Sequence, residues 1–317
     1  MPNYATAAQR QTDMTSAQAS VRLSLPIHQK VRLIAELHTG INVAVLRPLR
    51  GNVDRMLVLA LLMRTALTKP ERDGAISIHS AALSMGRPFE TVRRHIAALI
   101  ESGLCHRIDA GVTISPRFWR SRFIKGKLQY AHDCFVRFVA DATAAGAVEL
   151  PTVRSVGHFD EIDGVCAVLD LVLALVDQNR NLFPEAVDVA IFSAILHANM
   201  QRFAAEGGTL AARGESSTSF RQSHAVRVAA IARALSLPDT TVRRRIAAMT
   251  GPSGPLMRTR SGTLVDPAWL ERANAIACEA RHGSMQLILN RVAAVGFPFH
   301  APASAYLCGR PDSPRIA

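Results

Sequence analysis

The sequence lacks an apolar run long enough to cross a membrane. Its densest apolar stretches, 56–63 and 165–176, are shorter than the about 20 residues that a membrane-spanning helix needs, and the second contains Asp170. Residues 1–25 are polar and have no apolar core of the kind that a secretory signal peptide contains. We therefore expect no membrane partner and a cytoplasmic location.

Aromatic residues and cysteines are scarce. Aromatic side chains make up only 5% of the 317 residues, which leaves little material for the stacking surfaces that bind single-stranded nucleic acid. The five cysteines are odd in number and include no Cys-x-x-Cys pair, which argues against a disulfide framework and against a structural zinc site. This usage favours a reducing compartment, and the shortage of aromatics favours a duplex over a single strand as any nucleic-acid partner.

Motifs for catalysis and cofactor binding are also missing. The nearest approach to a phosphate-binding loop, at Gly126-Lys127, has Ser121 where the first glycine belongs and Leu128 where the hydroxyl belongs. The acidic run 160–164 lacks the later ligands of a calcium loop. We therefore expect a protein that is not an enzyme and needs no cofactor; an enzyme that acts on DNA is the alternative.

What the sequence has in excess is positive charge. It contains 37 Lys and Arg against 25 Asp and Glu, a formal net charge of +12, which favours polyanionic partners through steering and counterion release. The acids dominate only the stretch from Glu149 to Asp188, where they alternate with Val, Leu and Ile. This stretch predicts an amphipathic helix that packs two halves together or pairs two chains; the alternative is a surface helix with a solvated acidic face.

An internal repeat lies on either side of that acidic stretch. Residues 76–99 align without gaps with residues 226–249, an offset of 150 positions. Both copies contain the string Thr-Val-Arg-Arg, at Thr91–Arg94 and at Thr241–Arg244. Two tryptophans keep the same offset, Trp119 and Trp269. The repeat predicts that each copy forms one supersecondary unit.

The sequence pattern of each copy predicts a helix-turn-helix. Apolar helices with i, i+3, i+4 periodicity come first, over 54–68 and 184–203. A short strand and a short helix follow, over 76–78 and 79–85 in one copy and over 226–228 and 229–235 in the other. Gly86-Arg87-Pro88 and Ser236-Leu237-Pro238 are typical of turns and lead into a second helix, with Asp239 as the expected N-cap.

A β-hairpin follows each helix-turn-helix. The second helix ends at Gly103 or Gly251, as expected of a C-cap. Two short strands around a turn then predict a hairpin, here called a wing, over 104–114 and over 256–265. Long helical patterns come next, at 116–145 and 266–295. Each copy is therefore predicted to be a winged helix-turn-helix unit.

The predicted fold is mostly α with small β wings, in two winged helix-turn-helix domains joined by an acidic amphipathic helical segment. The expected boundaries are a disordered tail at 1–25, a first domain with its following long helix at 26–148, an acidic connector at 149–183, a second domain at 184–300 and a tail at 301–317, also expected to be disordered. Residues 204–224, rich in Gly and Ser, predict a flexible loop inserted into the second unit.

The second helix of each unit has one apolar face and one polar face. At 100° per residue, Val92, Ile96 and Leu99 share a face, as do Val242, Ile246 and Met249. The residues directly opposite are Glu90 and Arg94 in the first copy and Thr240 and Arg244 in the second. A helix of this kind can bury one face against its scaffold and present the other to a major groove.

The candidate DNA contacts follow from these positions. Arg94 and Arg244 are expected to contact guanine edges, while Glu90 accepts from a cytosine amino group or pairs with Arg93 or Arg94, the alternative we prefer. Phosphate contacts are expected from hydroxyls near the helix starts, from side chains flanking the outward face and from the wings. The complete set is Arg87, Glu90, Thr91, Arg93, Arg94, His95, Arg107, Thr240, Thr241, Arg243, Arg244, Arg245, Arg258 and Arg260.

At these residues the sequence resembles the winged helix-turn-helix superfamily of bacterial transcription regulators. The run Ile231-Ala232-Arg233-Ala234-Leu235, then Leu237-Pro238 and Thr241-Val242-Arg243-Arg244, is similar to the core of MarR-, IclR- and GntR-like DNA-binding domains, and Ala82, Met85, Pro88 and Thr91–Arg94 repeat it. The resemblance covers about 45 residues per copy. It departs from the usual regulator in having two units in one chain and no recognisable effector domain. It implies sequence-specific binding of double-stranded DNA without a cofactor.

The sequence therefore predicts a transcriptional regulator that binds double-stranded DNA through tandem recognition helices, as an intrachain pseudo-dimer or as half of a homodimer formed through its helical segments. Because the outward residues of the two copies differ, the two half-sites should differ. The alternatives are a replication initiator that binds origin repeats, and a winged-helix scaffold that binds proteins.

Overall fold

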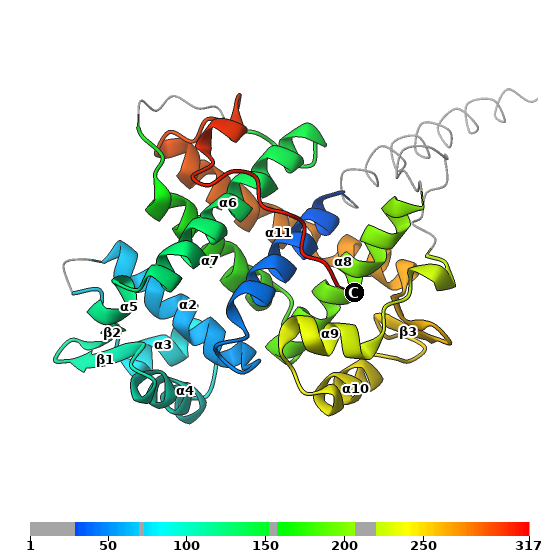
Figure 1. Ribbon diagram of the computed structural model, residues 1–317, viewed down its shortest axis with the longest axis horizontal. Coiled ribbons are helices and arrows are strands. Elements are labelled where there is room, and N and C mark those ends of the chain that lie inside the picture. Colours follow the sequence, from blue (N-terminus) through cyan, green and yellow to red (C-terminus); the bar gives the residue numbers. More distant parts are fainter. Residues whose placement is uncertain (1–28, 70–72, 152–156, 207–219, 317) are drawn as a thin grey trace, which may run out of the picture.

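The computed structural model describes residues 29–69, 73–151, 157–206 and 220–316. These residues form a mostly helical structure with two small antiparallel sheets of two strands each (Figure 1), which confirms the predicted combination of helices and small wings. A helix over residues 29–45 precedes the labelled elements and runs through the middle of the molecule. The expected tail at 1–25 and most of the expected loop at 204–224 lie outside the described residues.

The first unit follows the predicted succession of elements. The scaffold helix α2 is followed by the helix-turn-helix α3 and α4, the wing β1 and β2, and the helices α5 and α6. Their bounds are Val53–Thr68, Ile78–Met85, Phe89–Glu101, Cys105–Ile108, Gly111–Ile114, Pro116–Trp119 and Arg122–Ala144. The long helix expected over 116–145 is thus interrupted between α5 and α6.

The second unit repeats this plan. The central helix α7 is followed by the scaffold helix α8, the short helix η2, the helix-turn-helix α9 and α10, the wing β3 and β4, the long helix α11 and the short helix η3. Their bounds are Glu161–Gln178, Ala186–Ala205, Gln222–His224, Val228–Leu235, Asp239–Ala248, Leu256–Thr259, Gly262–Val265, Pro267–Ala294 and Pro302–Ala305.

The turn between the two helices of each unit uses a left-handed residue. Gly86 ends α3 with φ 52°, and Ser236 ends α9 with φ 54°. Glycine reaches this region without strain, whereas a serine there requires compensation from its surroundings. The expected N-cap at Asp239 is wrong, because Pro238 is the N-cap and Asp239 is the first helical residue, where its carboxylate still lies favourably near the positive end of the helix dipole.

The strands expected before each helix-turn-helix are not formed, and each is replaced by a single β-bridge. Ile76 pairs only with Val112, and Val226 only with Thr263. In the first unit the chain turns at once into α3, because the Ser77 hydroxyl accepts a hydrogen bond from the Ser80 amide at 3.0 Å. Each wing is therefore a two-stranded hairpin with an added antiparallel bridge, and Leu256 of the second wing also forms a parallel bridge with Thr250.

Two further local expectations are corrected. Gly103 follows the C-cap of α4 with φ 73°, as predicted, but α10 already ends at Ala248, with Met249 as its C-cap, so Gly251 does not cap it. The helices after the wings begin at Pro116 and Pro267, so equivalent residues are here one position further apart than the offset of 150. The residue equivalent to Trp269 is consequently Phe118, not Trp119.

The acidic helix α7 lies inside the molecule. It packs against α2, α6 and α11, and its apolar residues Val165, Ala167, Val168, Leu171, Val172 and Val176 are buried. At least one of its acidic residues also joins neighbouring helices. The Asp170 carboxylate accepts hydrogen bonds from Arg64 of α2 at 2.7 Å and from Arg291 of α11 at 3.1 Å. Most of the buried apolar residues between Leu33 and Ile316 form one hydrophobic cluster that includes members of both units.

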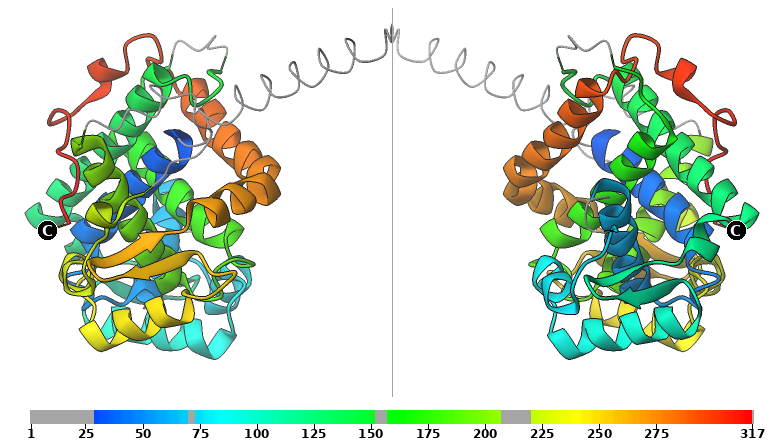
Figure 2. Two further views of the ribbon diagram at one scale, coloured as in Figure 1. Left: turned by 90° about the vertical axis from the view of Figure 1, so that its right-hand side faces the viewer. Right: turned by 90° about the vertical axis from the view of Figure 1, so that its left-hand side faces the viewer.

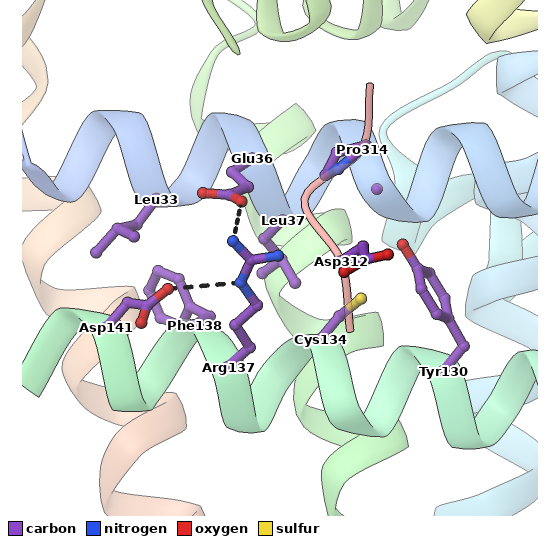
Figure 3. Close-up of a pocket in the computed structure, with 11 residues that line it drawn as sticks. Leu33, Glu36, Leu37, Tyr130, Cys134, Arg137, Phe138, Asp141, Asp312 and Pro314 are labelled. Carbon is purple, nitrogen blue, oxygen red and sulfur yellow. Dashed lines mark hydrogen bonds and ion pairs between the residues drawn. The ribbon is translucent and has the colours of Figure 1, made fainter. Parts of the chain in front are cut away.

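The expectation that residues 301–317 are disordered is wrong for 301–316. This C-terminal segment crosses the helix of residues 29–45 and α6 (Figure 3). The Asp133 carboxylate accepts from the amides of Leu307 and Cys308 at 2.8 and 2.9 Å, and the His197 ring bonds to the Pro314 carbonyl at 2.7 Å. These buried polar partners, spread over α6 and α8, hold a segment whose own composition indicates little structure.

Candidate nucleic-acid interface

The second helices of the two units, α4 and α10, lie along the same edge of the molecule. Figure 1 shows both at the lower edge, with the wings β1–β2 and β3–β4 on opposite outer sides. Figure 2 views the molecule from those two sides, and in each view one wing faces the viewer with α4 or α10 beneath it. One edge therefore presents both candidate recognition helices.

The predicted faces of these helices are confirmed. Val92, Ile96 and Leu99 are no more than 1% exposed, and their counterparts Val242, Ile246 and Met249 are buried as well. Arg93, Arg94, Arg243 and Arg244 are exposed. Within the described residues, Arg94 and Arg244 form no ion pair or hydrogen bond. Both guanidinium groups are thus available to an incoming ligand.

The first turn of α4 contains a bidentate ion pair. The Arg93 guanidinium donates to both carboxylate oxygens of Glu90, each at 2.7 Å, and this hydrogen bonding lowers the pKa of the Glu90 carboxyl. Of the two roles expected for Glu90, the structure contains the ion pair. The corresponding pair in α10, between Arg243 and Asp239, is longer at 3.6 Å. The first unit therefore presents a more neutral flank than the second.

Three expected phosphate contacts face the scaffold. The Arg245 guanidinium lies 3.5 Å from the buried carboxylate of Asp188 in α8, and Arg87 lies 3.7 Å from Asp54 in α2. His95 is half-buried near that same Asp54, and burial lowers its pKa. Arg245 and His95 border the buried face of their helices, and Arg87 lies in the turn before α4, so all three side chains lie near acidic residues in the first turn of a scaffold helix. Arg245 and His95 therefore do not lie on the outward flank, where we expected them.

The remaining candidates lie as expected or partly so. Arg107, Arg258 and Arg260 are exposed on the wings, and Thr240 is exposed on the first turn of α10. Arg107 lies opposite Val112 in its hairpin and Arg258 opposite Thr263, which are matching positions in the two wings. Thr91 and Thr241 are half-buried. The wings thus carry cations on either side of the recognition helices.

Two exposed apolar side chains on this surface escaped the sequence analysis. Phe89, the first residue of α4, is 48% exposed, and Leu83 of α3 is 75% exposed. In the repeat alignment Phe89 takes the position of Asp239. This replacement of an acid by an aromatic residue is the sequence signal that could have identified Phe89 as an unusual surface residue. Beside the first wing, α5 and α6 also carry a basic cluster that the second unit does not repeat, made of Arg117, Arg120, Arg122, Lys125 and Lys127.

The turns between the recognition helices and their partners are held by loops from the opposite unit. We call these the crossover loops: residues 46–52, which lead into α2, and residues 179–185, which lead into α8. Arg180 donates to the carbonyls of Met85 and Gly86, the latter at 3.1 Å. Gly51 packs so closely on the second turn that a methyl group there would lie 2.3 Å from the Ser236 oxygen. Each unit therefore supports the turn of the other.

The described residues contain no cluster of three or more His, Cys, Asp or Glu side chains that could hold a metal ion. Burial raises the pKa of the Cys105 thiol to about 12 and of the Cys134 thiol to about 11, so neither thiol ionises near neutral pH. Across the helices that the structure describes, none has the length and apolar character to span a bilayer.

Comparisons with protein-family models, with curated protein sequences and with solved structures found no match to this chain.

Proposed function

We propose that this protein is a sequence-specific binder of double-stranded DNA that acts as a transcriptional regulator. One observation carries the proposal: two helix-turn-helix units place α4 and α10 along one edge of the molecule with a wing beside each, and Arg94 and Arg244 on these helices are exposed. A pair of recognition helices on one edge can enter the major groove of one duplex on one face.

The chemistry of the exposed side chains suits this role. Arg94 and Arg244 have guanidinium groups without a partner in the described part of the chain, and these can donate to O6 and N7 of guanine, a contact that contributes about 1–3 kcal/mol of base discrimination. Arg243 and the wing arginines Arg107, Arg258 and Arg260 would contact phosphates, which positions the protein but does not select a sequence. Arg93 contributes less charge because Glu90 neutralises it.

The contacts assigned to Arg87, His95 and Arg245 are withdrawn from the proposal. Their side chains face the scaffold helices α2 and α8, so they fix the orientation of the recognition helices and do not reach a groove. The basic cluster of α5 and α6 supplies phosphate contacts on the outer side of the first wing in their place.

Binding to duplex fragments across a salt series tests the proposal. We expect a mixed pool of genomic fragments to be retained at about 50 mM salt, with a subset still retained at about 200 mM because it contains specific sites. The Arg94→Ala/Arg244→Ala variant should lose that subset. Arg315→Ala, which removes one exposed cation from the C-terminal segment, outside both helix-turn-helix units and both wings, should keep it.

An absence of salt-sensitive duplex binding would contradict the proposal and favour a protein-binding scaffold. Retention of single strands in preference to duplexes would contradict it as well. The positions of the enriched sites then distinguish a regulator from a replication initiator, because sites near promoters support the first and clustered repeats at an origin support the second.

A further inference from the structure

The crossover loops relate the two units in a reciprocal way. The loop before α2 contacts the turn at Ser236, and the equivalent loop before α8 contacts the equivalent turn at Gly86. In each case a loop of one unit meets the other unit at the same place. Reciprocal contacts of this kind are the mark of a two-fold relation, whereas units related by translation make head-to-tail contacts.

The arrangement of the elements agrees with a two-fold axis. When the molecule is viewed from its two opposite sides, each wing faces the viewer with its recognition helix beneath (Figure 2). Asp170 lies between the halves and binds one arginine from each, Arg64 and Arg291. The chain thus contains, within itself, the symmetry that other helix-turn-helix proteins obtain by pairing two chains.

We infer that one chain binds an imperfect inverted repeat whose two halves stand at a fixed separation; this inference rests on the proposed function. Two recognition helices related by a two-fold axis enter the grooves in opposite strand directions, so the bases that they contact are inverted. Units related by translation would instead select a direct repeat.

The separation of the two half-sites is fixed because the contacts between the two units are too close to allow the units to shift. A Cβ atom at Gly51 would lie 2.3 Å from the main-chain oxygen of Ser236 in the second turn, so there is no space for a methyl group. On the other side, Arg180 bonds to two main-chain carbonyls of the first unit. The Gly51 contact is between two stretches of main chain and cannot adapt by a change of rotamer, so we expect that the protein cannot follow a change in half-site spacing.

The repeat is imperfect because the first turns of α4 and α10 differ. Phe89 presents an exposed ring at the start of α4, and an apolar side chain there can contact the methyl group of thymine. At the same position α10 has Asp239, whose carboxylate repels phosphates and offers no apolar contact. Phe89 is therefore a residue that determines specificity in one half of the site only.

The test is selection from a random duplex library with the full-length chain. We expect a motif of two dissimilar halves at one spacing. Arg94→Ala should remove a guanine preference from one half and Arg244→Ala from the other, with the two guanines on opposite strands. Phe89→Ala should remove a thymine preference only in the half that Arg94→Ala affects. Guanines on the same strand would overturn the inverted arrangement.

Spacing and stoichiometry supply independent readouts. Insertion of about five base pairs between the halves turns them to opposite faces of the duplex, so we expect at least a roughly tenfold loss of affinity. One chain should bind per duplex by analytical ultracentrifugation. Unchanged affinity, or a requirement for two chains, would overturn the inference while leaving the proposed function intact. Failure to enrich any duplex would overturn both.

Discussion

The guanidinium group of Arg180 donates a hydrogen bond of 3.1 Å to the main-chain oxygen of Gly86, a residue 94 positions earlier in the chain. The same group bonds to the carbonyl of Met85 and to the carboxylate of Asp177, the latter at 2.9 Å. These carbonyls belong to the end of α3, where a helix lacks internal donors. A residue of the linker before α8 therefore completes the helix-turn-helix of the first unit.

Replacement of Arg180 by Ala should lower the free energy of unfolding by about 1–2 kcal/mol. Hydrogen bonds from a charged group contribute more to stability than neutral ones do. The expected loss is smaller than for a buried group because the Arg180 side chain is partly exposed. Urea denaturation at neutral pH measures the change. Arg243→Ala is the matched control, because its long ion pair with Asp239 lies fully on the surface, and it should change stability by less than about 0.5 kcal/mol. Equal effects of the two substitutions would contradict the role assigned to Arg180.

Gly51 and Gly103 provide a matched pair of glycine substitutions. Their φ angles are nearly equal, 72° and 73°, but a methyl group at Gly51 would meet the Ser236 oxygen while one at Gly103 would meet nothing within 4 Å. Gly103→Ala should thus cost only the backbone strain of about 1–2 kcal/mol. Gly51→Ala should cost about 1–3 kcal/mol more because it overpacks the contact between the units. Thermal and urea unfolding give both values, and a smaller cost at Gly51 would exclude a tight contact.

The faces of the recognition helices could be predicted from the sequence because periodicity determines them. Val92, Ile96 and Leu99 recur at the spacing of one helical face, and the structure buries all three. The repeat also gave the order of the elements. Residues at the border of that face could not be placed this way. His95 lies about 60° from Val92 on the helix, and only the position of α2 decides that it turns inward.

Contacts between distant parts of the chain could not be predicted either. The crossover loops contain no sequence motif that would predict a contact. Their structural role comes from the turns of the other unit against which they pack. The C-terminal segment is similar: the burial of residues near its end depends on partners such as Asp133 and His197, which carry no distinguishing signal in the sequence. The sequence therefore predicted the two units but not their relation to each other.

Replacement of Glu90 by Gln should strengthen binding to all duplexes. The change removes the carboxylate that neutralises Arg93, so one more cation is available to a phosphate. The dependence of log affinity on log salt should steepen by about one unit, as expected for one added phosphate contact. Asp239→Asn is the control in the second unit, where the longer pair predicts a smaller change. A loss of preference at a single cytosine would instead show that Glu90 contacts a base.

Acid should destabilise the protein through His38. This ring is fully buried, bonds to the Ser193 hydroxyl at 2.9 Å and has its pKa lowered by burial from 6.5 to about 4. Because the folded-state pKa is the lower one, the stability contribution is complete above pH 6.5 and is lost as the pH falls towards 4. The loss amounts to about 3 kcal/mol at about 1.4 kcal/mol per pH unit.

Urea denaturation between about pH 7.5 and about pH 4 measures this loss. His38→Gln retains an amide that can bond to Ser193 but does not titrate in this range, so stability should depend less steeply on pH in that variant. His79→Gln alters an exposed histidine of α3 and should leave the slope unchanged. If His38→Gln and the unsubstituted protein have parallel profiles, then His38 is not the group responsible.

Removal of residues 306–317 should destabilise the protein through the carboxylate of Asp133. This side chain is buried, and the amides of Leu307 and Cys308 supply two of its hydrogen bonds. Without these donors a buried charge loses part of its compensation, which costs about 1–3 kcal/mol for each group left unsatisfied. The contacts at Pro314 and the buried Ile316 are lost as well.

A double-mutant cycle separates the part due to Asp133 from the rest. Asp133→Asn removes the charge that the amides stabilise, so the truncation should cost about 1–2 kcal/mol less in the Asp133→Asn variant than in the unsubstituted protein. The free energies of unfolding of the four proteins give this coupling. Additive effects would mean that the segment acts through its other contacts, and that Asp133 is satisfied by His132, whose ring lies 3.0 Å from it.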